Sequence, residues 1–202
     1  MGDENILWDD RLQFKLLFID AETTGFIEKT EIVKHSHADG PHLLQVSWII
    51  TNLNGDIISQ NDFLVKPTNF SLPEDLFEMH NNKFQKAKQI GKSKEYILRG
   101  LQEALKQSNA IIGHNVIFDT EILQLEFDRL GIKSCLDEKL TCCTMMIGSS
   151  IFNNTGYRFP SLTDLSIKLL NKELIKRNNS IENVQTIMNC FWKLRDIGVI
   201  KI

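Results

Sequence analysis

The sequence has little of what marks membrane, secreted and highly basic proteins. No apolar run approaches the ~18 residues of a membrane-spanning helix, and the N-terminus lacks the basic and then apolar pattern of a signal peptide. The 202 residues carry a net charge of −3, so no overall positive field attracts nucleic acid, although a local patch or a metal ion can still bind phosphate. These absences predict a cytoplasmic protein that does not bind membranes.

Cysteine is also scarce, and its spacing excludes two common uses. Neither a disulfide framework nor the C-x-x-C spacing of a zinc site is found among the four cysteines, Cys135, Cys142, Cys143 and Cys190. We therefore expect structural thiols in a reducing compartment. No repeat, linker or low-complexity tract divides the chain, so we expect one domain over residues 1–202, with residues 1–12 as an N-terminal extension.

What is present is a mixed pattern of strands and helices. An apolar run that ends near Asp20 predicts a buried strand, and Asn54-Gly55 predicts a hairpin turn between two further strands. We expect these three strands to form an antiparallel meander within a mixed α/β sheet that helices cover. The other strands are expected at 43–51, 57–65 and 110–113, and the helices at 93–108, 117–130, 140–149, 161–170 and 180–196, with a short one from Ser71.

Two carboxylates stand near the end of the first strand. Asp20 and Glu22 are two residues apart, so in a strand their side chains point to the same face. Like charges held together raise each other's pKa unless a cation lies between them, and oxygen-only ligands favour Mg²⁺ or Mn²⁺. The pair therefore indicates either a divalent metal site or a strand that ends in a solvated polar loop.

A second group of polar residues follows the strand at 110–113. This strand-to-helix junction contains His114, Asn115 and Asp119. Asp119 could simply be favoured there by the helix dipole, because an acidic side chain stabilises the first turn of a helix. Open α/β sheets place their sites at the carboxyl ends of strands. Asp119 could therefore instead join the first two carboxylates in one metal centre.

Four stretches, taken in order, resemble the DnaQ-like (DEDD) 3′–5′ exonucleases, most closely the DEDDh branch. They are Asp20-Ala-Glu22-Thr23-Thr24-Gly25, residues 73–80, His114-Asn115 with Asp119, and Cys143-Thr144-Met145 with Phe159-Pro-Ser-Leu162. The resemblance covers about residues 14–196 and includes the DNA polymerase III epsilon-like exonucleases. It implies a ribonuclease H-like mixed sheet, an antiparallel meander plus parallel strands, flanked by helices. An unrelated ribonuclease H-like enzyme with another metal layout is the alternative.

The resemblance also implies a reaction, which is hydrolysis of a terminal phosphodiester with two Mg²⁺ or Mn²⁺ ions, with a single ion as the alternative. Asp20 would bridge the ions, Glu22 would hold the nucleophile-side ion, and Asp119 would serve the other. The implied partner is the 3′ end of a single-stranded nucleic acid, together with a replication or repair protein.

The resemblance assigns substrate contacts as well. Thr23 would offer its backbone N–H to the terminal nucleotide. His80, Asn115 and Phe118 are further candidate contacts, although each has a packing or capping alternative, and Phe118 fits the core better.

The third motif of the family is altered in this chain. Family members carry an Asp on the last helix, and the DEDDh branch carries a His five residues before it. The register of that helix places Asn183 and Asn178 at these positions. Asn183 offers a neutral oxygen in place of a charge, and the amide of Asn178 is not a usable base. Because a positioned general base contributes about 10²–10⁴-fold, we expect impaired hydrolysis.

Other residues could compensate. Glu182 neighbours Asn183, although it points about 100° away around the helix, and His35 and His37 follow the first motif, where a solvated loop is the simpler interpretation. The tyrosine branch of the family offers no rescue, since Asn179 occupies its position. Two hypotheses stay open: a slow exonuclease, or an inactive exonuclease-fold protein that binds nucleic acid or a protein partner.

Overall fold

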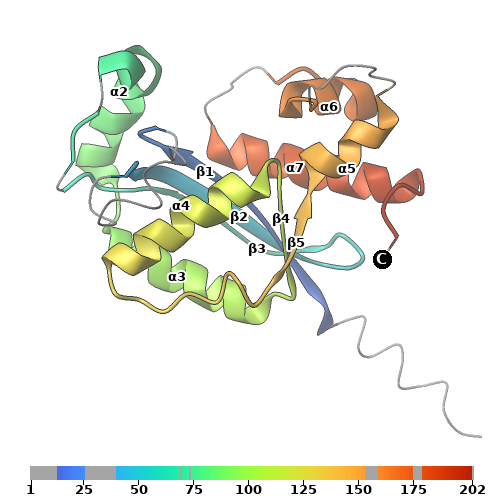
Figure 1. Ribbon diagram of the computed structural model, residues 1–202, viewed down its shortest axis with the longest axis horizontal. Helices are drawn as coiled ribbons and strands as arrows, with labels where there is room; N and C mark the ends of the chain where they lie inside the picture. The colour runs from blue at the N-terminus through green and yellow to red at the C-terminus, as the bar shows by residue number, and fades with distance from the viewer. Residues whose placement is uncertain are drawn as a thin grey trace, which may run out of the picture.

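A five-stranded sheet forms the centre of the computed structural model, which describes residues 13–25, 40–68, 70–72, 74–152, 159–174 and 179–201 (Figure 1). The strands are β1 (Lys15–Thr23), β2 (Leu43–Asn52), β3 (Ile57–Leu64), β4 (Ala110–Gly113) and β5 (Leu140–Cys143). The helices are α2 (Glu74–Ile90), α3 (Lys94–Gln107), α4 (Val116–Arg129), α5 (Thr144–Gly148), α6 (Leu162–Leu170) and α7 (Ser180–Asp196), with a 3₁₀ turn η1 (Ser149–Ile151) after α5. Within the described ranges, none of these helices is long and apolar enough to cross a membrane.

The sheet combines antiparallel and parallel pairing in the strand order β3-β2-β1-β4-β5. The β1–β2 and β2–β3 pairs are antiparallel, whereas β4 runs parallel to both β1 and β5. Gly55 has a φ of 91° in the turn between β2 and β3, a conformation that glycine adopts without steric cost. The predicted meander and the predicted mixed sheet are both confirmed.

Helices cover both faces of the sheet, so the side chains of β1 divide between two layers of core (Figure 1). Leu17 and Ile19 pack with α3 and α4, whereas Leu16 and Phe18 pack against α7. Alternate residues of a strand point to opposite faces. Asp20 therefore continues the row of Leu16 and Phe18 and belongs to the α7 side of the sheet.

Two expected helices differ from the structure. The first half of the helix expected at 140–149 is the strand β5, because the free edge of β4 supplies the backbone partners that residues 140–143 need. The helix expected to be short after Ser71 is α2, which begins at Glu74 and has 17 residues. Its length carries the chain past the end of β1, where it contributes two residues to the site described below.

Helix α4 lies where the sequence predicts it, but its buried face is not purely apolar. Ile117, which belongs to the apolar pattern, is exposed, whereas Asp119 and Glu126 are buried. Acidic side chains are seldom fully buried without partners. Both carboxylates therefore have roles beyond filling the core.

Candidate active site

The end of β1 meets the first turn of α7, and this contact defines the surroundings of Asp20. The Ser180 hydroxyl donates a hydrogen bond to the Asp20 carbonyl oxygen at 2.7 Å. The Asn183 side-chain amide donates to both carboxylate oxygens of Asp20, at 3.3 and 3.4 Å. Asn183 thus presents a hydrogen-bond donor to Asp20 at a position where an aspartate would have added an acceptor for a cation.

Asp119 lies in the first turn of α4, next to the same stretch of β1. Its Oδ1 accepts a hydrogen bond from the Ala21 backbone N–H at 2.9 Å, and its side chain is buried. Burial and then the negative charge of Asp20 raise the pKa of Asp119 well above its ordinary value. Burial raises the pKa of Asp20 to about 7 despite the Asn183 hydrogen bond, and the charge of Glu22 adds to the rise. In the surroundings that the described residues provide, joint ionisation of the two aspartates is therefore unfavourable unless a cation binds between them.

Glu22, in contrast, has a cation of its own. Lys83 of α2 forms a close ion pair with Glu22 Oε2, and the two side chains are 15% and 10% exposed. His80, one turn earlier on α2, places its Nδ1 3.9 Å from the same oxygen. Burial lowers the pKa of His80, although the charge of Glu22 opposes this effect. Sequence reasoning missed Lys83, although its i,i+3 spacing from His80 puts both on one face of a helix.

These oxygen ligands fit a divalent cation in part. Within the described residues, no three His, Cys, Asp or Glu side chains are gathered closely enough to hold a metal ion. The carboxyl groups of Asp20 and Asp119 offer hard oxygen donors, and a divalent ion would favour their joint ionisation, so together they could hold one ion. Glu22 is instead neutralised by Lys83.

The remaining candidate residues of β1 and α4 have local roles. The Thr23 hydroxyl donates to the Gly25 carbonyl oxygen at 2.5 Å. Asn115 is exposed in a left-handed conformation at the start of α4, with its backbone N–H directed at Cys143 Sγ at 3.3 Å. Phe118 is half-buried and packs against the core, as the sequence favours.

Several residues could replace the altered third motif, but only some of them lie in the part of the chain that the structure describes. The structure gives the contact with Asp20 to Asn183 and not to Glu182, which lies on the first turn of α7 beside it. Asn178, His35 and His37 lie outside the described residues. On the last helix, the side chain that contacts Asp20 is therefore that of Asn183.

His114 acts as a brace beside the site. Its Nε2 lies 3.1 Å from the Pro160 carbonyl oxygen, which can only accept, so Nε2 carries the proton. Its Nδ1, which carries no proton in the neutral ring, lies 3.1 Å from Thr144 Oγ1, whose hydroxyl is also 3.2 Å from the Gly113 carbonyl oxygen. Burial lowers the pKa of His114 to about 4 despite the Pro160 contact, so the ring is neutral at pH 7. With both nitrogens engaged, His114 connects the start of α4 to α5 and to the segment before α6.

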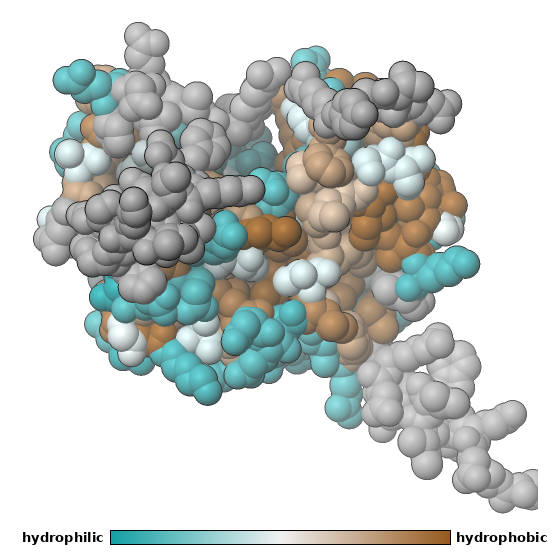
Figure 2. Space-filling model, viewed as in Figure 1, coloured by the Kyte–Doolittle hydropathy of each residue, from teal (hydrophilic) through white to brown (hydrophobic). Residues whose placement is uncertain are grey.

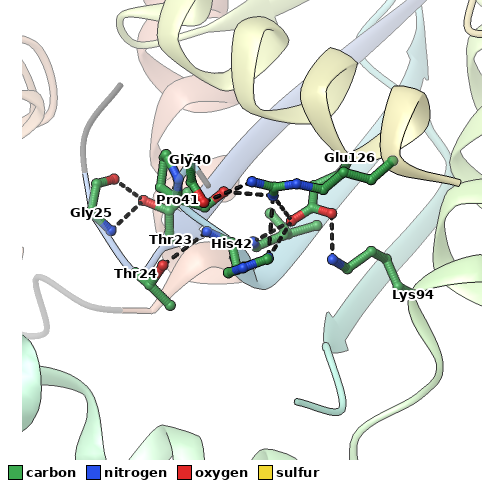
Figure 3. A network of polar contacts seen from close by, with 10 residues as sticks. Thr23, Thr24, Gly25, Gly40, Pro41, His42, Lys94 and Glu126 are labelled. Carbon is green, nitrogen blue, oxygen red and sulfur yellow. Dashed lines mark hydrogen bonds and ion pairs between the residues drawn. The ribbon is translucent and has the colours of Figure 1, made fainter. Parts of the chain in front are cut away.

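A second buried carboxylate organises the segments that flank the site (Figure 3). Glu126 Oε1 accepts from the Leu43 backbone N–H at 2.9 Å and pairs with Arg129 at 2.9 Å, while Oε2 pairs with Lys94. Arg129 also donates to the carbonyl oxygens of Gly40 and Pro41, at 2.7 and 2.8 Å. The network thus joins α3, α4 and the segment that enters β2. Sequence reasoning missed Glu126, whose only signal is a Glu on the apolar face of α4.

The charge on the two aspartates predicts how stability depends on pH in the absence of metal. Because Asp20 binds its proton more tightly in the folded state, its contribution is fully present below pH 3.8 and is lost as the pH rises to about 7. In EDTA, the free energy of unfolding from urea titration should therefore fall between pH 5 and pH 8. We expect Asp119→Asn to raise it at pH 8 by about 1–2 kcal/mol, since the amide keeps the Ala21 contact and removes the charge. Wild-type stability that is level across this range would contradict the assignment.

The molecular surface is hollowed on the face that Figure 2 shows. In the view of Figure 1, the space-filling model shows a hollow between the side that carries α2 and the side that carries α5 and α6 (Figure 2). Hydrophilic residues lie at the floor of this hollow, and hydrophobic residues lie along the side that carries α5 and α6 (Figure 2).

The mixed sheet, with carboxylates at the end of β1 and in the first turn of α4, defines a nuclease fold of the ribonuclease H-like class. The family model described as Exonuclease matches residues 17–188. The chain therefore belongs to this exonuclease family, and its fold is that of the DnaQ-like 3′–5′ exonucleases. Members of the family generally use divalent metal ions. No curated protein sequence matches the chain significantly.

Solved structures of exonuclease I share this fold. A zinc-bound complex of Escherichia coli exonuclease I with single-stranded DNA is 17% identical, with a TM-score of 0.71 over 92% of this chain. Exonuclease I from Methylocaldum szegediense is 14% identical, also with a TM-score of 0.71 over 92% of this chain. The chain spans 41% of the length of each of these proteins. At this identity the likeness concerns the fold alone.

Proposed function

We propose that this domain binds the 3′ end of a single-stranded nucleic acid and hydrolyses its terminal phosphodiester weakly, with a divalent metal ion. The observation that carries the proposal is the contact of the Asn183 amide with both carboxylate oxygens of Asp20. The site keeps an acidic pair, Asp20 and Asp119, and has a neutral residue at the position where the family has a further carboxylate.

The acidic pair, Asp20 and Asp119, supports metal binding. The neutral Asn183 supports the proposal that this binding is weak. Asp20 and Asp119 would hold Mg²⁺ or Mn²⁺, which when bound would polarise the phosphodiester and lower the pKa of an attacking water. A carboxylate ligand contributes charge that an amide does not, so replacement of the expected Asp by Asn183 lowers the affinity of the site for the cation. His114 does not replace the missing base, because both of its ring nitrogens are engaged.

A non-catalytic role is the second candidate, and Lys83 is the observation that favours it. Because the Lys83 ammonium pairs with Glu22, the Glu22 carboxylate is less available to bind a metal ion. A protein that binds nucleic acid, or a replication or repair partner, without cutting would keep the fold and the hollow of Figure 2 but need no second ion.

Single-stranded DNA is the first substrate to test, because structures of exonuclease I include complexes with single-stranded DNA and with an oligonucleotide. We expect slow 3′ shortening of 5′-labelled single-stranded DNA or RNA in Mn²⁺, abolished by EDTA and by Asp20→Asn. Asp128→Asn, an exposed acid on α4, is the matched control and should cut like the wild type. Binding without any shortening would favour the second candidate. Absence of binding to either nucleic acid would contradict the first candidate and the nucleic-acid form of the second, and would leave only a protein partner.

A further inference from the structure

We propose that Lys83 is a built-in cation of the active site, which neutralises Glu22 and restricts the site to a single divalent ion on Asp20 and Asp119. The inference rests on the proposed function, because that function supplies the metal ion. It adds a role for helix α2 and a count of ions that the family membership does not determine.

Lys83 of α2 lies directly against Glu22. Its ammonium and the Glu22 carboxylate form a close ion pair whose side chains are 15% and 10% exposed, so solvent screens their attraction only weakly. Removing one partner of such a buried pair leaves an uncompensated charge, which is costly. A metal ion that took Glu22 as a ligand would have to displace this ammonium.

The charges of the site balance with one divalent ion and the Lys83 ammonium. Among the residues that the structure describes, the acidic side chains of the site, Asp20, Glu22 and Asp119, carry three negative charges when ionised, and Asn183 carries none. One divalent ion and one ammonium match these three charges. Two divalent ions together with Lys83 would exceed them by two, in a setting where burial makes unbalanced charge unfavourable.

The Glu22 carboxylate has a second oxygen, Oε1, that does not take part in the pair with Lys83. Within the described residues, Glu22 Oε1 is buried and has no hydrogen-bond partner. His80 Nδ1, 3.9 Å from the other oxygen, is likewise buried without a hydrogen bond. The carboxylate therefore keeps an acceptor that a second ion could use if the ammonium were removed.

A titration of the full chain with Mn²⁺ alone tests the inference, with calorimetry for the stoichiometry and electron paramagnetic resonance for the bound fraction. Wild type should bind one ion. Lys83→Met should bind a second ion, or bind the first at least about tenfold more tightly. Lys86→Met, which removes an exposed lysine from the same helix, is the matched control and should bind like wild type. Two ions on wild type, or an unchanged titration of Lys83→Met, would overturn the inference.

If the single variant folds poorly, the double variant Glu22→Gln/Lys83→Met still tests the inference, because it removes both charges of the pair together. We expect it to bind one Mn²⁺ with an affinity within a few fold of wild type. If Glu22 were a ligand of that ion, the affinity would fall by about tenfold or more, and the inference would fail. Circular dichroism melts in EDTA report folding for each variant.

Failure of this inference is distinguishable from failure of the proposed function. The ion count needs neither nucleic acid nor hydrolysis. A wild-type protein that shortens DNA slowly but takes two Mn²⁺ ions refutes the role of Lys83 and leaves the function intact. A protein that binds one Mn²⁺ but no nucleic acid refutes the function and leaves the role of Lys83 intact.

Discussion

The double variant Asn178→His/Asn183→Asp should shorten 5′-labelled single-stranded DNA in Mn²⁺ at least ~10²-fold faster than the wild type. Asn183→Asp replaces the amide that contacts Asp20 with a carboxylate, which adds a negatively charged ligand beside the acidic pair. Asn178→His supplies a group that can accept a proton from the attacking water near neutral pH. The second substitution rests on the family register, because Asn178 lies outside the described residues.

The effect of Asn183→Asp on metal binding should be measurable apart from the effect of Asn178→His on hydrolysis. Asn183→Asp alone should lower the thermal stability of the protein in EDTA, because a further carboxylate joins Asp20 and Asp119. It should also enlarge the rise in melting temperature on adding Mn²⁺, since tighter binding to the folded state stabilises it. The same pair of substitutions in an Asp20→Asn background should stay inactive. A double variant that folds and binds Mn²⁺ but cuts no faster than wild type would show that the third motif is not the defect.

Removal of the buried charge at Glu126 should have the largest effect on stability. We expect Glu126→Gln to lower the free energy of unfolding by about 3–5 kcal/mol, measured by urea titration at pH 7. The side chain of Glu126 is fully buried and pairs with Lys94 and Arg129, so the neutral amide would remove the negative charge that stabilises both cations there. The segment that enters β2 should loosen, because Arg129 also holds Gly40 and Pro41.

The effect of Glu126 should also appear in the pH profile. Burial raises its pKa, but His42, Lys94 and the Leu43 N–H outweigh this and lower the pKa to about 2 from 4.5. The stabilisation is therefore present above pH 4.5 and is lost as the pH falls towards 2, a loss that Glu126→Gln should not show. The control is Glu95→Gln, whose exposed pair with Arg99 should contribute less than about 1 kcal/mol. Equal costs for the two substitutions would contradict the assigned role of Glu126.

Local sequence patterns were sufficient for most of the secondary structure. Ser93 begins α3 as expected, with its hydroxyl accepting from the Tyr96 N–H at 3.3 Å, and Ser161 caps α6 in the same manner. These elements follow from side chains that act on their own neighbours in the chain. Strand β5 did not follow, because its four residues carry no strand pattern and become a strand only by pairing with β4.

The residues of the site also fall into two groups: those that local sequence patterns indicate, and those that only the fold brings together. The i,i+2 spacing of Asp20 and Glu22 and the motif that contains Asp119 could be found from sequence, because each lies within a few residues of a recognisable strand or helix boundary. The proximity of Asp20 and Asn183, 163 residues apart, was accessible only through the resemblance of the last helix to the family pattern. Lys83 and Glu126 were missed, since an isolated lysine and an isolated glutamate on helices ordinarily face solvent.

The sequence by itself determined the fold class, the three acidic residues and the neutral character of Asn183, because these depend on residue type and on short-range periodicity. The tertiary structure alone decided which charges meet: Lys83 of α2 on Glu22, Asn183 of α7 on Asp20, and Glu126 of α4 among Lys94 and Arg129. The physical reason is that the energy of a charge depends on its burial and on partners that only folding brings within a few ångströms.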